Sequence, residues 1–243
     1  MPKEDPIEIL KNKIINGDER LVLNKKKCKN ITFLNCYSYY IYRKNCSYYT
    51  SFHGIHCDGF LLKNLVKLVG IQTKRKSFDM TSLAPEVFEN AEKNNHSVAI
   101  VGSKDEYLRL AIENIKKKFV NLNIVESRHG FFENENEKNK FLEKIKKLSP
   151  DIVIVGMGTP LQDLFLKQLK DKGWTGIGYT CGGFIHQTAT KGTVYYPKFI
   201  DRYNLRWLYR IYDEPKLMKR YAFYYPLSIL LFFYDVIKYK LIR

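Results

Sequence analysis

Short apolar runs that alternate with helical stretches of about a dozen residues predict an α/β fold with a Rossmann-like, mostly parallel sheet flanked by helices. The clearest runs are Ser97–Val101 (SVAIV) and Asp151–Val155 (DIVIV). Hydrophobic residues make up 45% of the 243 residues, which is enough to bury a core. We expect an α/β core at residues 1–190, followed by a basic, apolar C-terminal helical appendage at residues 191–243.

The first ninety or so residues hold the less regular elements. NITFLN is rich in strand-forming residues, whereas FLLKNLVKLV has helical spacing and ends at Gly70, a typical helix stop. The Asp58-Gly59 pair breaks the chain between them. The expected elements are a weak N-terminal helix, a strand at 30–35, a helix to Tyr42, an extended segment at 48–57, and helices at 60–69 and 82–93.

The remaining elements repeat a strand–turn–helix pattern. We expect strands at 97–101, 122–126, 151–155 and 175–180, and helices at 106–119, 136–148 and 161–172. Parallel sheets bind ligands beyond the carboxyl ends of their strands. That rule points to the turns at 102–103, 156–159 and 181–184.

Glycines in these turns are candidates for a nucleotide-phosphate site. The candidates are Gly102, Gly156, Gly158, Gly182 and Gly183. Glycine lets backbone N–H groups approach a phosphate, and the start of a helix favours an anion. A tight strand-to-helix turn would use the same residues, so both interpretations stay open.

Other residues with catalytic potential are sparse. Asp58-Gly59 is a turn dipeptide by default, although its carboxylate could also serve as a general base. The chain has no D-x-D motif, and its five cysteines form no C-x-x-C pair. We therefore expect neither a metal site nor a bound cofactor.

The C-terminal segment combines positive charge with an apolar run. From Lys191 to Arg243 there are 11 Lys and Arg against 4 Asp and Glu, and 14 of the 17 residues from Tyr221 to Ile237 are hydrophobic. A helix of that length measures roughly 25 Å, short of a hydrocarbon core of about 30 Å. We expect it to lie on an anionic membrane surface. A helix docked on the core is the alternative, and an exposed apolar tail would also favour a homo-oligomer.

A net charge of +16 could indicate a protein that binds nucleic acid. The basic clusters are scattered and no nucleic-acid-binding motif is present, so we expect no such partner. The N-terminus lacks the apolar region of a signal peptide, which predicts a cytoplasmic location.

A set of motifs in a fixed order resembles bacterial glycosyltransferases of the WecG/TagA/CpsF family. The similarity runs from about Asn30 to Tyr221. The motifs are ITFLN, CDGF, KSFDMTSLAPEVF, HGFF, SPDIVIVGMGTPLQD, GYTCGGF and LRWLYRIYDEP with a following KRY.

This resemblance implies transfer of a sugar from a UDP-sugar to a polyprenyl-diphosphate-linked, GlcNAc-like acceptor. The donor would carry an N-acetylmannosamine-type sugar or another hexose, and the reaction would invert its anomeric centre without a metal. The resemblance also implies a peripheral enzyme at the cytoplasmic face of the bacterial inner membrane, active in O-antigen, capsule or teichoic acid synthesis.

The resemblance assigns roles residue by residue. Asp58 matches the catalytic base, Asn35 and Gln162 match substrate-binding positions, and Arg210 and Arg220 match arginines of the appendage. Arg206 is a further candidate for a diphosphate, because Arg binds such groups bidentately.

Four departures from the family pattern leave the donor sugar open. Phe33 stands where the family has Thr, Asp163 replaces a Glu, Lys216 replaces an Arg, and Tyr195-Tyr196-Pro197 replaces Arg-Ala-Pro. The missing Thr and the lost Arg-Ala-Pro motivate one alternative, a non-catalytic nucleotide- or anion-binding module. A peripheral membrane scaffold that uses only the tail is a further alternative.

Overall fold

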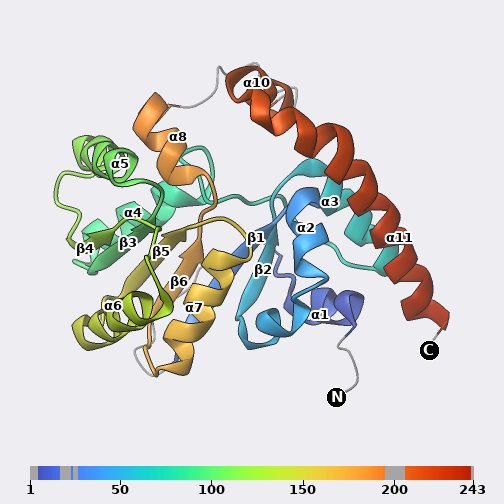
Figure 1. The fold of residues 1–243 in the computed structure, drawn as a ribbon, viewed down its shortest axis with the longest axis horizontal. Helices are drawn as coiled ribbons and strands as arrows, with labels where there is room; N and C mark the ends of the chain where they lie inside the picture. The colour runs from blue at the N-terminus through green and yellow to red at the C-terminus, as the bar shows by residue number, and fades with distance from the viewer. Residues whose placement is uncertain (1–4, 17–22, 24–26, 195–205, 242–243) are drawn as a thin grey trace.

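A central six-stranded sheet organises the protein (Figure 1). The computed structural model describes residues 5–16, 23, 27–194 and 206–241. The strand order is β2-β1-β6-β5-β3-β4, and every neighbouring pair is parallel. The α/β class is thereby confirmed. The strands are β1 (Lys29–Leu34), β2 (Gly54–Cys57), β3 (Val98–Gly102), β4 (Ile124–Arg128), β5 (Ile152–Gly156) and β6 (Ile177–Thr180).

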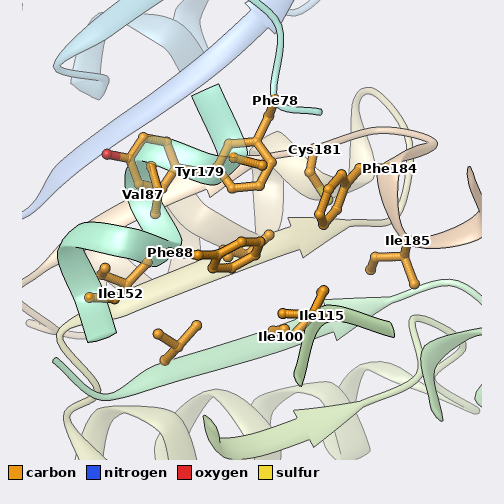
Figure 2. Packing of buried hydrophobic residues seen from close by; sticks show 14 of the residues in the cluster. Phe78, Val87, Phe88, Ile100, Ile115, Ile152, Tyr179, Cys181, Phe184 and Ile185 are labelled. Carbon is orange, nitrogen blue, oxygen red and sulfur yellow. The ribbon is translucent and has the colours of Figure 1, made fainter. Parts of the chain in front are cut away.

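Helices cover both faces of the sheet. One face packs on α4 (Leu83–Lys93), α5 (Asp105–Lys118) and α8 (Phe184–Lys191), around the aromatic cluster seen in Figure 2. The other face packs on α6 (Glu135–Leu148) and α7 (Leu161–Asp171). Burial on both sides explains why strands such as DIVIV are apolar throughout rather than alternating.

A third apolar cluster joins the two ends of the chain. It combines α1 (Pro6–Lys13), α2 (Cys36–Tyr42), α3 (Phe60–Leu65) and the 3₁₀ turn η2 (Val66–Val69) with the C-terminal helix α11 (Tyr225–Leu241). α11 packs directly on α2 and α1. The 3₁₀ turn η3 (Pro215–Leu217) and the π-helical turn η4 (Arg220–Tyr224) connect it to α10 (Arg206–Asp213). The predicted division at residue 190 falls at the end of α8 and stays a prediction.

One expected element is wrong in its first part. The sequence predicts an extended segment at 48–57, and β2 confirms its end, but its start belongs to the 3₁₀ turn η1 (Cys46–Ser51). The Tyr49 ring is fully buried against Tyr42 and Phe52, with centroid separations of 4.9 and 5.5 Å. Burial of that ring overrides the strand propensity of the aromatic residues.

A buried ion pair attaches α11 to α2. The Asp235 carboxylate, 3% exposed, accepts hydrogen bonds from Arg43 Nε at 2.8 Å and Nη2 at 2.6 Å, and from the Tyr39 hydroxyl at 2.7 Å. Ser228, also buried, donates to the backbone oxygen of Cys36. Each polar group that α11 buries is thus matched on α2. No helix within the described ranges is long and apolar enough to cross a membrane.

Replacing Asp235 by Ala should lower the free energy of unfolding by about 3 kcal/mol, because Arg43 and Tyr39 would lose their buried partner. Denaturant titration measures the change. The control, Asp171→Ala, removes an exposed pair with Lys167 and should have little effect. Equal effects of the two substitutions would show that the buried pair is not what holds α11.

Candidate active site

A cavity of about 870 Å³ opens beyond the carboxyl ends of β1, β2, β5 and β6. The segment from Glu214 to Ile229, including the start of α11, contributes to its lining. Its size suits a substrate-sized ligand, and its position follows the rule for parallel sheets. Seven of the predicted site residues line it: Asn35, Asp58, Gly158, Gln162, Gly182, Gly183 and Arg220.

Asp58 lies where β2 ends. Its N–H donates to the Leu34 carbonyl at 2.7 Å and so extends the pairing of β2 with β1. Gly59 then takes φ +108°, which turns the chain sharply into α3. The half-buried Asp58 side chain lines the cavity near Cys57 and Tyr225. Burial, and then the Asp58 charge, raise the pKa of the Cys57 thiol to about 12.

Asn35 occupies the matching position after β1. Its side-chain oxygen accepts the Ser38 N–H at 3.0 Å, and its own N–H donates to Ser38 Oγ at 2.7 Å. This capping box begins α2. Because the cap uses the oxygen, the amide NH₂ is the group through which Asn35 can donate to a ligand.

Gln162 links the two glycine turns of the cavity. Its Oε1 accepts the Gly182 N–H at 3.1 Å, and its Nε2 contacts Thr159 Oγ1 at 3.4 Å. Gly158 and Gly182 have φ of +77° and +52°, values that favour glycine. No side chain in the described ranges caps the N-terminus of α7 or α8. Two N–H groups of the first turns already donate to the backbone: Gln162 to the Gly158 carbonyl and Phe184 to the Cys181 carbonyl, both at 3.0 Å. Both helices still begin at the cavity, where the positive end of a helix dipole favours an anion.

Gly102 and Gly156 are not among the residues that line the cavity. A Cβ on Gly102 would lie 2.3 Å from the Gly156 oxygen, and one on Gly156 would lie 2.8 Å from Cys181 Sγ. Both positions require glycine because backbone segments approach closely there. Their expected role in substrate binding stays a prediction.

Of the three predicted arginines, the structure describes one side chain. Arg220 lines the cavity, with its guanidinium 4.5 Å from the centroid of the Tyr37 ring. This is the spacing of a cation–π contact. Arg206 and Arg210 belong to α10, but their side chains lie outside the part of the chain that the structure describes.

Arg75 is a cationic lining residue that the sequence pattern did not single out. A parallel bridge joins it to Cys57, and the neighbouring Lys76 N–H donates to the Cys57 carbonyl at 3.0 Å. This pairing sets Arg75 beside Asp58 in the fold. In the sequence Arg75 is one of several scattered basic residues, and nothing local distinguishes it. Thr159 lies in a turn that the sequence did point to, whereas six further polar lining residues were missed: Ser77, Asp79, Thr180, His186, Gln187 and Glu214.

A buried polar network lies beneath the cavity. Asp163 is fully buried and accepts the Thr32 hydroxyl at 2.6 Å, and Thr32 is 2.9 Å from the hydroxyl of the lining residue Thr180. Burial raises the pKa of Asp163 to about 6. The network connects α7, β1 and β6. No cluster of three or more His, Cys, Asp or Glu side chains suited to a metal ion occurs among the described residues.

The profile described as "Glycosyl transferase WecG/TagA/CpsF family" matches residues 11–243. The chain belongs to this family. Its sequence is 38% identical over 214 residues to the UDP-Gal:alpha-D-GlcNAc-diphosphoundecaprenol beta-1,4-galactosyltransferase of Shigella boydii, covering 88% of this chain and 89% of that enzyme. The resemblance drawn from the motifs is confirmed, and the protein is a glycosyltransferase.

Among solved structures, an extracellular ligand-binding receptor from Rhodopseudomonas palustris is similar at 15% identity, over 69% of this chain and 64% of that one, with a TM-score of 0.34. Similarity at this level supports no conclusion about the glycosyltransferase.

Asp163 should make the glycosyltransferase less stable as pH rises. Its folded pKa of about 6 exceeds the ordinary 3.8, so between pH 4 and 6 the folded state keeps a proton that the unfolded chain releases. The wild-type free energy of unfolding should therefore fall across this window by up to about 3 kcal/mol relative to Asp163→Asn. Urea titration at pH 4, 5, 6 and 7 measures the difference. His56, whose pKa burial lowers to about 4, titrates in both proteins and cancels. A difference that does not change with pH would contradict the raised pKa.

Proposed function

We propose that this glycosyltransferase moves a hexose from a UDP-hexose to the sugar of an undecaprenyl-diphosphate-linked GlcNAc. UDP-galactose is the first donor to test, because the Shigella boydii relative is named for it. The observation that carries the proposal is that Asp58 shares one cavity with Arg75, Arg220 and the N-terminal ends of α7 and α8. A carboxylate beside anion-binding groups suits deprotonation of an acceptor next to a departing nucleotide.

The proposed reaction is a single displacement. Asp58 takes the proton of the acceptor hydroxyl while that oxygen bonds to the anomeric carbon. The bond to UDP breaks at the same time, and UDP leaves with the electron pair. Attack opposite to the leaving group inverts the anomeric centre. General-base help of this kind is worth typically about 10²–10⁴-fold in rate.

The leaving UDP needs groups that hold its growing negative charge. We assign this task to the N-terminal ends of α7 and α8 together with Arg75, all at the cavity. These groups would let transfer proceed without a metal. The donor is identified with a panel of UDP-sugars, a GlcNAc-diphosphate-lipid acceptor and mass detection, with and without chelator. Transfer that stops on chelation would contradict the metal-independent part of the proposal.

Asp58→Asn should lower kcat by about 10²–10⁴-fold while leaving UDP affinity nearly unchanged, because the amide keeps the shape but cannot accept the proton. Transfer is followed by mass spectrometry and UDP binding by calorimetry. Asp171→Asn, an exposed acid on α7, is the control and should behave as wild type. Full turnover by the Asp58 variant would overturn the base assignment. A non-catalytic anion-binding module would instead bind UDP and show no transfer in either protein.

The outer side of α11 supports contact with a membrane surface. Phe232 and Val236 are buried, whereas Leu230, Phe233 and Ile237 are 68%, 44% and 59% exposed. Lys238 and Lys240 lie in the last turn of the helix. We propose that this outer side lies on anionic lipid, as an apolar stripe with cations beside it would. The protein would then be a peripheral enzyme at the surface where its lipid-linked acceptor resides.

Leu230→Ser/Phe233→Ser/Ile237→Ser should weaken binding to anionic vesicles at least about tenfold, since each side chain loses apolar contact with lipid. Flotation with phosphatidylglycerol vesicles measures this, and Leu110→Ser/Val120→Ser, which alters exposed apolar residues elsewhere, is the control. Truncation after Asp213 is a poorer test because it uncovers the cluster that α11 completes. Unchanged flotation with loss of an oligomer in sedimentation would mean that the stripe is a contact between copies of the chain.

A further inference from the structure

The lining of the cavity includes a set of apolar residues beside its polar ones. Three consecutive residues of α3, Phe60, Leu61 and Leu62, line it together with Tyr225, Pro226 and Ile229 from the first two turns of α11. We refer to these six residues as the apolar groove. A nucleotide-sugar has no hydrocarbon part that would fill such a surface, so a donor site alone does not account for it.

Two residues of the apolar groove are unusually exposed for large apolar side chains. Phe60 and Leu61 are 56% and 38% exposed, although Leu62 beside them is 1% exposed. Exposed large apolar side chains that adjoin a polar cavity mark a surface with an apolar ligand rather than ordinary packing. Two further apolar side chains on these parts of the chain are exposed: Leu68 on η2, which follows α3, is 51% exposed, and Leu230 on α11 is 68% exposed.

Both sides of the groove change from polar to apolar in the same order along the chain. On one side Asp58 is followed by Phe60 and Leu61. On the other side Arg220 precedes Tyr225 and Ile229 by roughly one and a half to two and a half helical turns. A ligand that fits both sides has a reacting sugar at one end, then an anionic group, then hydrocarbon. A polyprenyl-diphosphate-linked sugar has this order.

We propose that the apolar groove holds the first isoprene units of the lipid-linked acceptor. This inference rests on the proposed function and adds a hydrocarbon subsite to it. The acceptor sugar lies at Asp58, the diphosphate lies near Arg220, and the chain leaves between α3 and α11 toward the exposed side of α11. The enzyme thereby recognises the lipid as well as the sugar, and discriminates against soluble sugar diphosphates.

The test compares two soluble acceptors with the same GlcNAc-diphosphate head: a geranyl ester, which carries two isoprene units, and an ethyl ester. Below the micelle concentration and without vesicles, wild-type kcat/KM should favour the geranyl acceptor by roughly 10- to 100-fold, mainly through KM. In Phe60→Ser/Leu61→Ser the preference should fall to within about threefold. Leu110→Ser/Val120→Ser should retain the wild-type preference, since those exposed apolar residues lie outside the cavity.

Each result decides between interpretations. If wild-type kcat/KM is nearly the same for the geranyl and ethyl acceptors, the proposed hydrocarbon subsite is wrong, and Phe60 and Leu61 contact a bilayer instead. If Phe60→Ser/Leu61→Ser keeps a strong preference for the geranyl acceptor, the proposed subsite is also wrong, because the geranyl group must then bind elsewhere. Transfer to neither acceptor from any UDP-hexose would refute the proposed function itself, and the groove with it.

Discussion

The position of β1 between β2 and β6 is the constraint on which the site depends. Because β1 pairs in parallel with both neighbours, residues that are far apart in the sequence emerge at one edge of the sheet. Asn35, Asp58 and the Gly182-Gly183 turn thus reach the same cavity. The Asp58 N–H to Leu34 bond continues this pairing one residue past β2, so the proposed base is held by the sheet rather than by a free loop.

The C-terminal segment completes the cavity, and its attachment is electrostatic as well as apolar. Tyr39 on α2 and Arg43 at its C-terminal cap bind Asp235, and the lining residue Asn35 is the N-terminal cap of the same helix. The same helix therefore carries a ligand-facing residue at its start and the contact for α11 further along. A shift of α11 would move Tyr225 and Ile229 relative to Asp58. Attachment of the tail and the geometry of the cavity are coupled through this helix.

Much of the sheet could be predicted from the sequence because its strands are short apolar runs between glycine turns. Most expected strand and helix ends lie within about two residues of the observed ones, and the glycine turns after β5 and β6 reach the cavity. What the sequence could not predict depends on tertiary pairing. Arg75 enters the site through a bridge to Cys57, and Asp163 gains its raised pKa only from burial. The tail is apolar nearly all round, so periodicity could not tell which side α11 would bury.

Three aspartates near the cavity illustrate how environment separates possible roles. Asp163 is fully buried and hydrogen-bonded to Thr32, so it cannot reach a substrate hydroxyl despite a pKa of about 6. Asp79 lines the cavity, but one of its oxygens accepts from Ser77 at 2.7 Å and the other from Thr81. Those bonds shape the turn before α4 and engage both carboxylate oxygens.

Asp58 is half-buried, unlike Asp163, and it lines the cavity two residues before the apolar groove begins at Phe60. In the proposed binding mode, an acceptor whose hydrocarbon lies in the apolar groove brings its sugar to this carboxylate. The location of the lipid would then decide which sugar hydroxyl meets the base. Binding of the polyprenyl chain would therefore also select the sugar hydroxyl that attacks the donor.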